Sequence, residues 1–302
     1  MQRPDVLVLA AGGVVGRGWM AGVLTGLEEQ TGWDLRQCEA FVGTSAGSIV
    51  AATLAAGHSP RIPDWVREVG DGESDREDDS SYLEQLLGGA GRLGIAVTRP
   101  AAGPLLRAFG PLGAVLRAAM LARAPRGRQS LAGLVERIDR LDVSFDGRLR
   151  IVAVDAGSGR RTVFGESGAP TASVARAVEA SCSIPGVFPP VRIGDREYVD
   201  GGVWSLTNMD VAPVRRGQHV LCLNPTGRSA LAGSPLARTL ASWSRARVAL
   251  EEQYLEARGV SVQTIGPDRT AAEELGPNLM DHRRTHEGAG AGHRQAQRIM
   301  RA

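Results

Sequence analysis

The sequence predicts an α/β fold built on a parallel sheet. The chain has 302 residues, 43% of them hydrophobic, so it can bury one large core or two modest ones. Its opening alternates strand, glycine loop, helix, strand, sharp turn and helix, which is the order typical of parallel strands joined by helices. Val6–Ala10 starts this series as a short, continuous apolar run, typical of a central strand buried on both faces.

The next three elements follow from periodicity and glycine stops. A helix is predicted over about residues 17–30, where four apolar side chains recur on one face and Gly32 follows as a stop. Ala40–Gly43 is predicted to be the second strand. Ser48–Ala56, rich in small and apolar residues, is predicted to be a helix that Gly57 ends.

The second half predicts a hairpin and then a mostly helical end. Residues 149–154 and 161–164 are two β-like runs joined by a glycine-containing turn, which indicates an antiparallel hairpin. A helix is expected over 173–180 and a strand over 220–223. The last hundred residues are polar and predicted to be mostly helical, and no internal repeat is found.

The middle of the chain is basic and carries a helical apolar pattern. No Asp or Glu occurs from Gln85 to Val135. The same stretch contains seven arginines, Arg92, Arg99, Arg107, Arg117, Arg123, Arg126 and Arg128. A segment of this kind, about residues 92–128, fits peripheral contact with an anionic membrane surface, or else an ordinary helical subdomain packed on the core. Upstream, the acidic run 71–79 is expected to be a solvated linker and not a metal site.

Composition excludes several classes of function. The net charge is only +2, which gives no sign of a nucleic-acid surface. Three widely spaced cysteines argue against a disulfide framework or a zinc site and fit a cytoplasmic protein. The N-terminal apolar run stops at Gly12, too early for a signal peptide, and no window is apolar enough to predict a membrane span.

The pentapeptide Gly43-Thr44-Ser45-Ala46-Gly47 has the pattern G-x-S-x-G between a predicted strand and a predicted helix. A nucleophile needs this setting, because the sharp turn lifts its hydroxyl above the sheet and the flanking glycines let strand and helix approach. The helix N-terminus adds positive potential where negative charge develops. Ser45 is therefore the candidate nucleophile; the alternative is a tight turn in which Ser45 only caps the helix.

Acyl transfer also needs hydrogen-bond donors for the developing oxyanion. The glycine-rich loop after the first strand can supply successive backbone N–H groups, and Gly12 and Gly13 are the candidate donors. A rival interpretation is dinucleotide binding, since Gly16–Ala21 matches G-x-G-x-x-A with Glu39 downstream. That motif should begin directly after the strand, whereas here five residues intervene. A Walker phosphate loop is excluded because the chain has no lysine.

The base is the next question, because most serine hydrolases use a histidine. None of the five histidines follows an evident catalytic pattern; they are His58, His219, His282, His286 and His293. Asp200, at the end of a predicted strand and before two glycines, lies in an open turn where its carboxylate can face a cavity. It could accept the Ser45 proton directly if partly desolvated. Asp155, in the hairpin turn, is the alternative carboxylate.

Taken together, these motifs resemble the patatin-like phospholipase family. The resemblance is carried by the glycine loop, by G-T-S-A-G, and by ASCSIPGVFPP at 180–190 with YVDGG at 198–202. It is firmest over roughly 5–57 and 148–224. The family's loop usually begins with three glycines and has a basic residue two places on. Here Ala11 replaces the first glycine, Val15 takes the basic position, and Arg17 follows two places later.

The resemblance implies a fold and a reaction. The fold would be a single patatin-like domain over 1–302, a three-layer α/β/α sandwich around a mostly parallel sheet, with a helical cap insertion at about 60–147. Ser45 would be the nucleophile and Asp200 its base, with Gly12 and Gly13 in the oxyanion hole. The expected activity is hydrolysis of acyl lipid esters without metal or cofactor. The alternatives are a Ser-His-Asp esterase and a catalytically idle lipid-binding module.

Overall fold

The computed structural model describes residues 1–61, 111–227 and 235–301. Within them one sheet runs through hydrogen-bonded neighbours in the order β5-β6-β3-β2-β1-β7-β8, and β4 also pairs with β3. The strands are β1 (Val6–Leu9), β2 (Ala40–Thr44), β3 (Leu149–Asp155), β4 (Arg161–Phe164), β5 (Val191–Ile193), β6 (Arg196–Asp200), β7 (His219–Leu223) and β8 (Ser261–Ile265). Strands β3, β2, β1, β7 and β8 are parallel, whereas β4, β5 and β6 join antiparallel.

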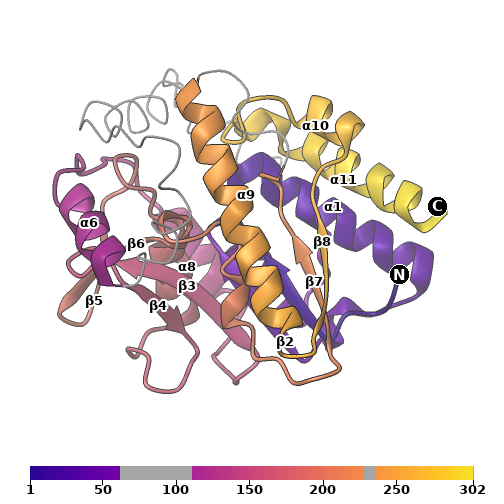
Figure 1. Cartoon of the computed structure of the whole chain (residues 1–302), viewed down its shortest axis with the longest axis horizontal. Helices are drawn as coiled ribbons and strands as arrows, with labels where there is room; N and C mark the ends of the chain where they lie inside the picture. The colour runs from indigo at the N-terminus through magenta and orange to yellow at the C-terminus, as the bar shows by residue number, and fades with distance from the viewer. Residues whose placement is uncertain (62–110, 228–234, 302) are drawn as a thin grey trace.

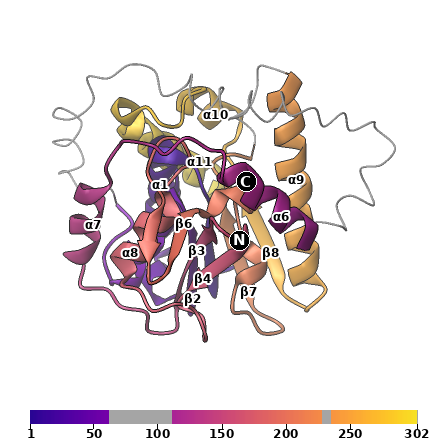
Figure 2. The ribbon, with the colours of Figure 1, turned by 90° about the vertical axis from the view of Figure 1, so that its left-hand side faces the viewer.

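Helices cover both faces of this sheet (Figures 1 and 2). The α-helices are α1 (Gly13–Thr31), α2 (Ala46–Ala55), α6 (Pro111–Leu121), α7 (Ala132–Asp139), α8 (Val174–Cys182), α9 (Pro235–Glu256), α10 (Arg269–Leu275) and α11 (Thr285–Arg301). Leu7 and Leu9 of β1 face the cluster made by α1, α2, α8 and α11. Val6 and Val8 face the other way, toward α9. The predicted three-layer α/β/α fold is confirmed, because alternate residues of a strand point to opposite faces.

The pairing around β3 brings the ends of two strands together. Ile151–Val152 pair with both β2 and β4, so these two strands lie on opposite edges of β3. Ala153–Val154 pair with both β4 and β6, so β6 lies on the same edge as β2. Thr44 ends β2 against the first pair, and Asp200 ends β6 against the second. The two strands therefore meet end to end, and Ser45 leaves β2 beside Asp200.

Most predicted elements lie within a few residues of their expected place, including the antiparallel hairpin β3–β4. Two differ. The first helix begins at Gly13 and not near residue 17, so the glycine loop forms its first turn. The polar C-terminal region contains the strand β8, which pairs with β7. Its three middle residues are all half-buried, so β8 lacks the alternation of buried and exposed side chains by which a strand is predicted from sequence.

The expected cap is described only in part. Residues 62–110, which include the acidic run 71–79 and much of the basic segment, lie outside the described residues. The described part holds α6 and α7, and α7 buries Leu134 and Ile138 in the main core. No helix in the described ranges has the length and apolar character needed to cross a membrane.

Candidate active site

Ser45 occupies a strained turn between β2 and α2. Its φ of 51° and ψ of −124° lie in a region that side chains other than glycine rarely adopt. The flanking glycines allow this close approach, since a Cβ at Gly47 would lie 2.0 Å from the Leu9 carbonyl oxygen. A Cβ at Gly43 would lie 2.5 Å from the Cα of Ser48. The turn thus holds the Ser45 hydroxyl at the end of β2, next to the end of β1.

Hydrogen bonds from neighbouring serines hold this turn. The backbone N–H of Ser45 donates to the hydroxyl oxygen of Ser181 at 2.9 Å, and that hydroxyl donates to the carbonyl oxygen of Val152 at 2.6 Å. The Ser48 hydroxyl donates to the carbonyl oxygen of Ser45 at 2.6 Å. Ser45 does not cap helix α2 with its side chain. The capping interpretation of Ser45 is therefore wrong, and its hydroxyl is available for another partner.

That partner is Asp200. The Ser45 side chain lies near enough to the Asp200 carboxylate to lower the pKa of this group, and the N–H of Gly202 donates to Oδ1 of the same group at 2.6 Å. Asp200 is only 6% exposed, and Ser45 only 7%. Burial raises the pKa of Asp200 to about 6, although the Ser45 side chain and the N–H of Gly202 act in the opposite direction. A carboxylate with this pKa is ionised at neutral pH and is a stronger base than an exposed aspartate.

Asn208 ties the two halves of this site together. Its Nδ2 donates to Thr44 Oγ1 at 3.1 Å and lies 3.3 Å from the carbonyl oxygen of Gly201. Thr44 precedes the candidate nucleophile and Gly201 follows the candidate base, so one buried amide links both turns. Sequence reasoning missed Asn208, which belongs to no motif. It also missed Ser181, although Ser181 lies in the segment that carries the family resemblance.

The glycine loop presents free amides beside the turn at Ser45, the sharp strand-to-helix connection of residues 43–47 that we call the elbow. The N–H of Ala11 donates to the carbonyl oxygen of Leu206, and the N–H of Val15 donates to that of Leu279. Among the described residues, no acceptor is recorded for the N–H groups of Gly12 and Gly13. Both stand at the N-terminus of α1, where the helix dipole adds positive potential. Such amides suit an oxyanion.

A C-terminal segment packs over this loop. Gly13 has a φ of +61°, and a Cβ there would lie 2.5 Å from the Leu279 carbonyl oxygen and 2.9 Å from the sulfur of Met280. The Leu279 carbonyl also accepts the N–H of Val15 at 3.0 Å. A residue 266 positions downstream thus fixes the first turn of α1. Sequence reasoning placed no function in this segment.

Arg17, the displaced basic residue of the loop, lies one turn inside α1. Burial lowers its pKa to about 10, and the nearby positive charge of Arg137 acts in the same direction. Cys182 lies on the same side, with its sulfur 3.8 Å from the Ser48 hydroxyl. Arg17 is therefore near the elbow, although it is not part of the loop that carries the free amides.

The other sequence candidates are engaged elsewhere. The Asp155 carboxylate accepts the N–H groups of Gly157 and Ser158 and pairs with Arg196, so it holds the β3–β4 turn. His219 begins β7, at the opposite end of the sheet from Ser45. The recorded partners of Asp200 within the described ranges include no histidine.

The dinucleotide pattern has a structural explanation. Gly18, inside the motif, lies within helix α1, where a Cβ would be 2.2 Å from the carbonyl oxygen of Thr285 at the start of α11. Gly22 makes a similar approach to Ala289. Glu39, the expected ribose ligand, pairs with Arg215 at the surface. These glycines let α11 pack closely on α1, which explains the glycine spacing without dinucleotide binding.

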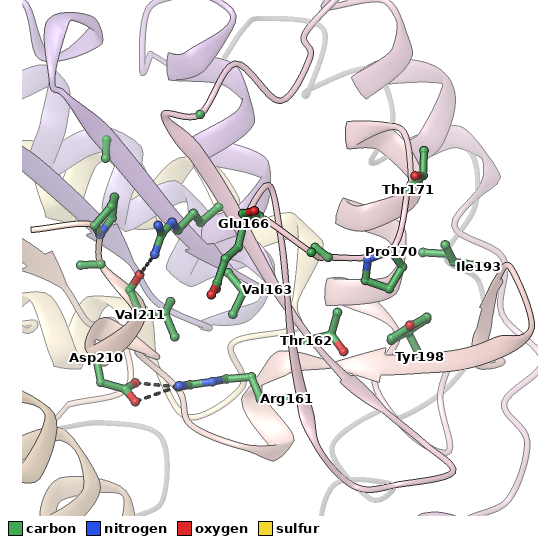
Figure 3. Close-up of a pocket in the computed structure, with 18 of the residues that line it drawn as sticks. Arg161, Thr162, Val163, Glu166, Pro170, Thr171, Ile193, Tyr198, Asp210 and Val211 are labelled. Carbon is green, nitrogen blue, oxygen red and sulfur yellow. Dashed lines mark hydrogen bonds and ion pairs between the residues drawn. The ribbon is translucent and has the colours of Figure 1, made fainter.

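A large hollow of about 1320 Å³ lies apart from this site. Its lining comes from the β4 and β5–β6 region and the segment after Asp210, and includes neither Ser45 nor Asp200. Figure 3 shows Arg161 of this lining in a two-point ion pair with Asp210. The lining includes neither residue of the candidate site, so the hollow has no bearing on the candidate nucleophile.

Comparison with known proteins bears on the whole arrangement. The family model described as patatin-like phospholipase matches residues 7–213, which include the glycine loop, the elbow and the Asp200 turn. Residues 279 and 280, which pack on Gly13, lie beyond the match. No curated protein sequence matches the chain significantly.

Among solved structures, VipD from Legionella pneumophila is similar with 16% identity and a TM-score of 0.47. The alignment covers 99% of this chain and 67% of VipD. The ExoU–SpcU complex of the type III secretion system of Pseudomonas aeruginosa is similar with 22% identity and a TM-score of 0.38. This alignment covers 100% of the chain but only 53% of the matched one.

Proposed function

Because the chain belongs to the patatin-like phospholipase family, we propose that it hydrolyses carboxylic ester bonds of phospholipids or related acyl lipids with a Ser45–Asp200 dyad. The observation that carries the proposal is the position of Ser45, at the end of β2, beside Asp200, a buried carboxylate at the end of β6 whose pKa is raised to about 6. No metal or organic cofactor takes part.

The reaction proceeds through an acyl-enzyme. Ser45 Oγ attacks the ester carbonyl carbon while Asp200 accepts the hydroxyl proton, and the amides of Gly12 and Gly13 stabilise the tetrahedral oxyanion. Asp200 then donates the proton to the leaving alcohol as the ester C–O bond breaks. In the second half, Asp200 removes a proton from water as the water oxygen attacks the acyl carbon. Asp200 then returns this proton to Ser45 Oγ as the bond from Ser45 Oγ to the acyl carbon breaks, which releases the fatty acid and restores the Ser45 hydroxyl and the Asp200 carboxylate.

A fluorophosphonate probe and a phospholipid assay test this function. The wild-type protein is expected to be labelled on Ser45 and to release fatty acid from phosphatidylcholine vesicles, whereas Ser45→Ala should do neither. Ser59→Ala is the matched control and should keep both properties, because this exposed serine follows the far end of α2 and lies outside the proposed dyad. An unlabelled wild-type protein would favour the idle lipid-binding module instead.

The rate should also depend on pH through Asp200. The base acts only when deprotonated, and burial raises its pKa to about 6. We therefore expect kcat/KM to fall about tenfold per pH unit below about pH 6 and to level off above about pH 7. Fatty-acid release across this range measures it. A profile that falls only near pH 4, the ordinary range of an exposed aspartate, would contradict a desolvated base.

The competing triad has its own test. A Ser-His-Asp esterase would lose acylation when one histidine is replaced, so each of the five is changed to glutamine in turn. The dyad predicts that all five variants keep the labelling rate of the wild-type protein.

The cytoplasmic location remains a prediction, as does the single-domain organisation.

A further inference from the structure

Helix α6 exposes apolar side chains where a helix on a protein surface usually carries polar ones. Val115 is 68% exposed, Leu116 45% and Met120 42%. These are half of the exposed large apolar side chains in the described ranges; the others are Met1, Leu250 and Tyr254. Spacings of one and four residues put the three on one side of the helix. We call this set the α6 face.

The opposite side of α6 packs on the protein through small groups. A Cβ at Gly159 would lie 2.1 Å from the carbonyl oxygen of Ala114 and 2.7 Å from the N of Ala118, so the helix backbone rests on the β3–β4 turn. Arg117 donates to the carbonyl oxygen of Gly159 and stacks 4.1 Å from the ring centre of Trp204. The amphipathic pattern of α6 is thus inverted, with its larger apolar side chains outward. α6 lies at the left edge of the molecule in Figure 1 and faces the viewer in Figure 2.

The charged side chains in the segment that follows the α6 face are all positive, up to Val135. Arg123, Arg126 and Arg128 follow the helix and are all exposed. Arg126 pairs with Glu197 across the surface, and the Arg123 guanidinium donates to the carbonyl oxygen of Ala119, its one hydrogen-bond partner in the part of the chain that the structure describes. From Pro111 to Val135 the sequence contains no Asp or Glu. An apolar face bordered by arginines complements an anionic lipid surface.

The α6 face is connected to the catalytic half of the sheet. Glu197, the partner of Arg126, lies on β6, the strand that ends in Asp200. The N–H of Gln129 donates to the carbonyl oxygen of Val187, in the segment that leads into β5. Trp204, on which Arg117 stacks, stands four residues after Asp200. Contact at the α6 face would therefore place the Asp200 side of the protein near the bound surface.

We propose that the α6 face docks the protein on an anionic phospholipid bilayer, with Val115, Leu116 and Met120 in the acyl–headgroup boundary and the arginines on lipid phosphates. Three partly inserted apolar side chains and a few arginines give reversible, salt-sensitive binding. Docking is separate from the chemistry, since no residue of the α6 face and none of these arginines contacts Ser45 or Asp200 in the part of the chain that the structure describes. It raises turnover only for substrate held in a bilayer.

Vesicle sedimentation tests the proposal in a Ser45→Ala background, so that lipid is not consumed. The protein should bind vesicles of phosphatidylcholine mixed with phosphatidylglycerol and bind pure phosphatidylcholine more weakly. The variant Val115→Ser/Leu116→Gln/Met120→Gln should lower the partition coefficient roughly tenfold or more. Arg123→Gln/Arg128→Gln should lower it about fivefold per arginine on the anionic vesicles.

The matched control is Leu250→Gln/Tyr254→Gln, which changes an exposed apolar pair on α9. This variant should bind the vesicles as tightly as the protein with an unaltered α6 face. With Ser45 present, the α6 variants should keep full turnover of a soluble p-nitrophenyl ester, which shows that they fold. Unchanged vesicle binding by the triple variant overturns the proposal. So does a dimer, seen by light scattering, that the triple variant dissociates without any effect on vesicles, because a second copy would then cover the face.

Discussion

Replacing Asp200 by asparagine is expected to lower kcat/KM for a phospholipid about 10³-fold, within the usual range for removing a general base. Asparagine has nearly the same shape and can still accept the N–H of Gly202 through its amide oxygen. It cannot take up the Ser45 proton. Fatty-acid release and the rate of fluorophosphonate labelling measure the loss.

Asp155→Asn is the matched control, since Asp155 is also buried and its amide counterpart can still accept Gly157 and Ser158. It should keep near wild-type turnover. The reverse result, with Asp155→Asn inactive and Asp200→Asn active, would transfer the role of base to Asp155. Equal activity in both variants would remove the dyad altogether.

Stability shows whether an inactive Asp200→Asn protein is folded. Burial raises the pKa of Asp200 from 3.8 to about 6. Between these values the folded protein holds a proton that the unfolded chain has released, so the free energy of unfolding falls as pH rises through about 6. Asparagine carries no charge. The variant should therefore melt above the wild-type protein at pH 8, and the difference should shrink toward pH 4.

Replacing Gly13 by alanine should lower kcat about 10²-fold, at the scale of losing one oxyanion donor. The new Cβ would lie 2.5 Å from the Leu279 carbonyl oxygen and 2.9 Å from the Met280 sulfur, at a φ of +61° that alanine disfavours. Either the glycine loop or the segment at Leu279 and Met280 must move. The N–H groups of Gly12 and Gly13 would then no longer point at the position of the oxyanion. Steady-state kinetics should show the loss in kcat with little change in KM.

Gly32→Ala separates this effect from backbone strain. Gly32 ends the same helix at a φ of +71°, and a Cβ there meets nothing within 4 Å. Its substitution should cost about 1 kcal/mol of stability and leave kcat unchanged. If Gly13→Ala also keeps its kcat, the N–H groups of Gly12 and Gly13 are not the oxyanion donors. The N–H groups at the start of α2 would then be the candidates for this role.

The sequence by itself determined the features that depend on neighbouring residues. A serine at the point where an apolar strand turns into a small-residue helix, with glycine two places to each side, predicts the strained elbow that the structure has at Ser45. Periodicity predicted β1, β2 and the hairpin in the same way. It failed for the start of α1, because the two glycines of the loop are poor helix formers and contact with Leu279 holds them in the first turn.

Only the tertiary structure decided which distant groups meet Ser45. Asp200 lies beside it because β2 and β6 share one edge of β3, a register set by pairing between strands far apart in the chain. Asn208 and Ser181 brace the site through single hydrogen bonds that leave no periodic trace in the sequence. Local patterns encode turns and faces, whereas a meeting across 155 positions depends on packing of the whole sheet.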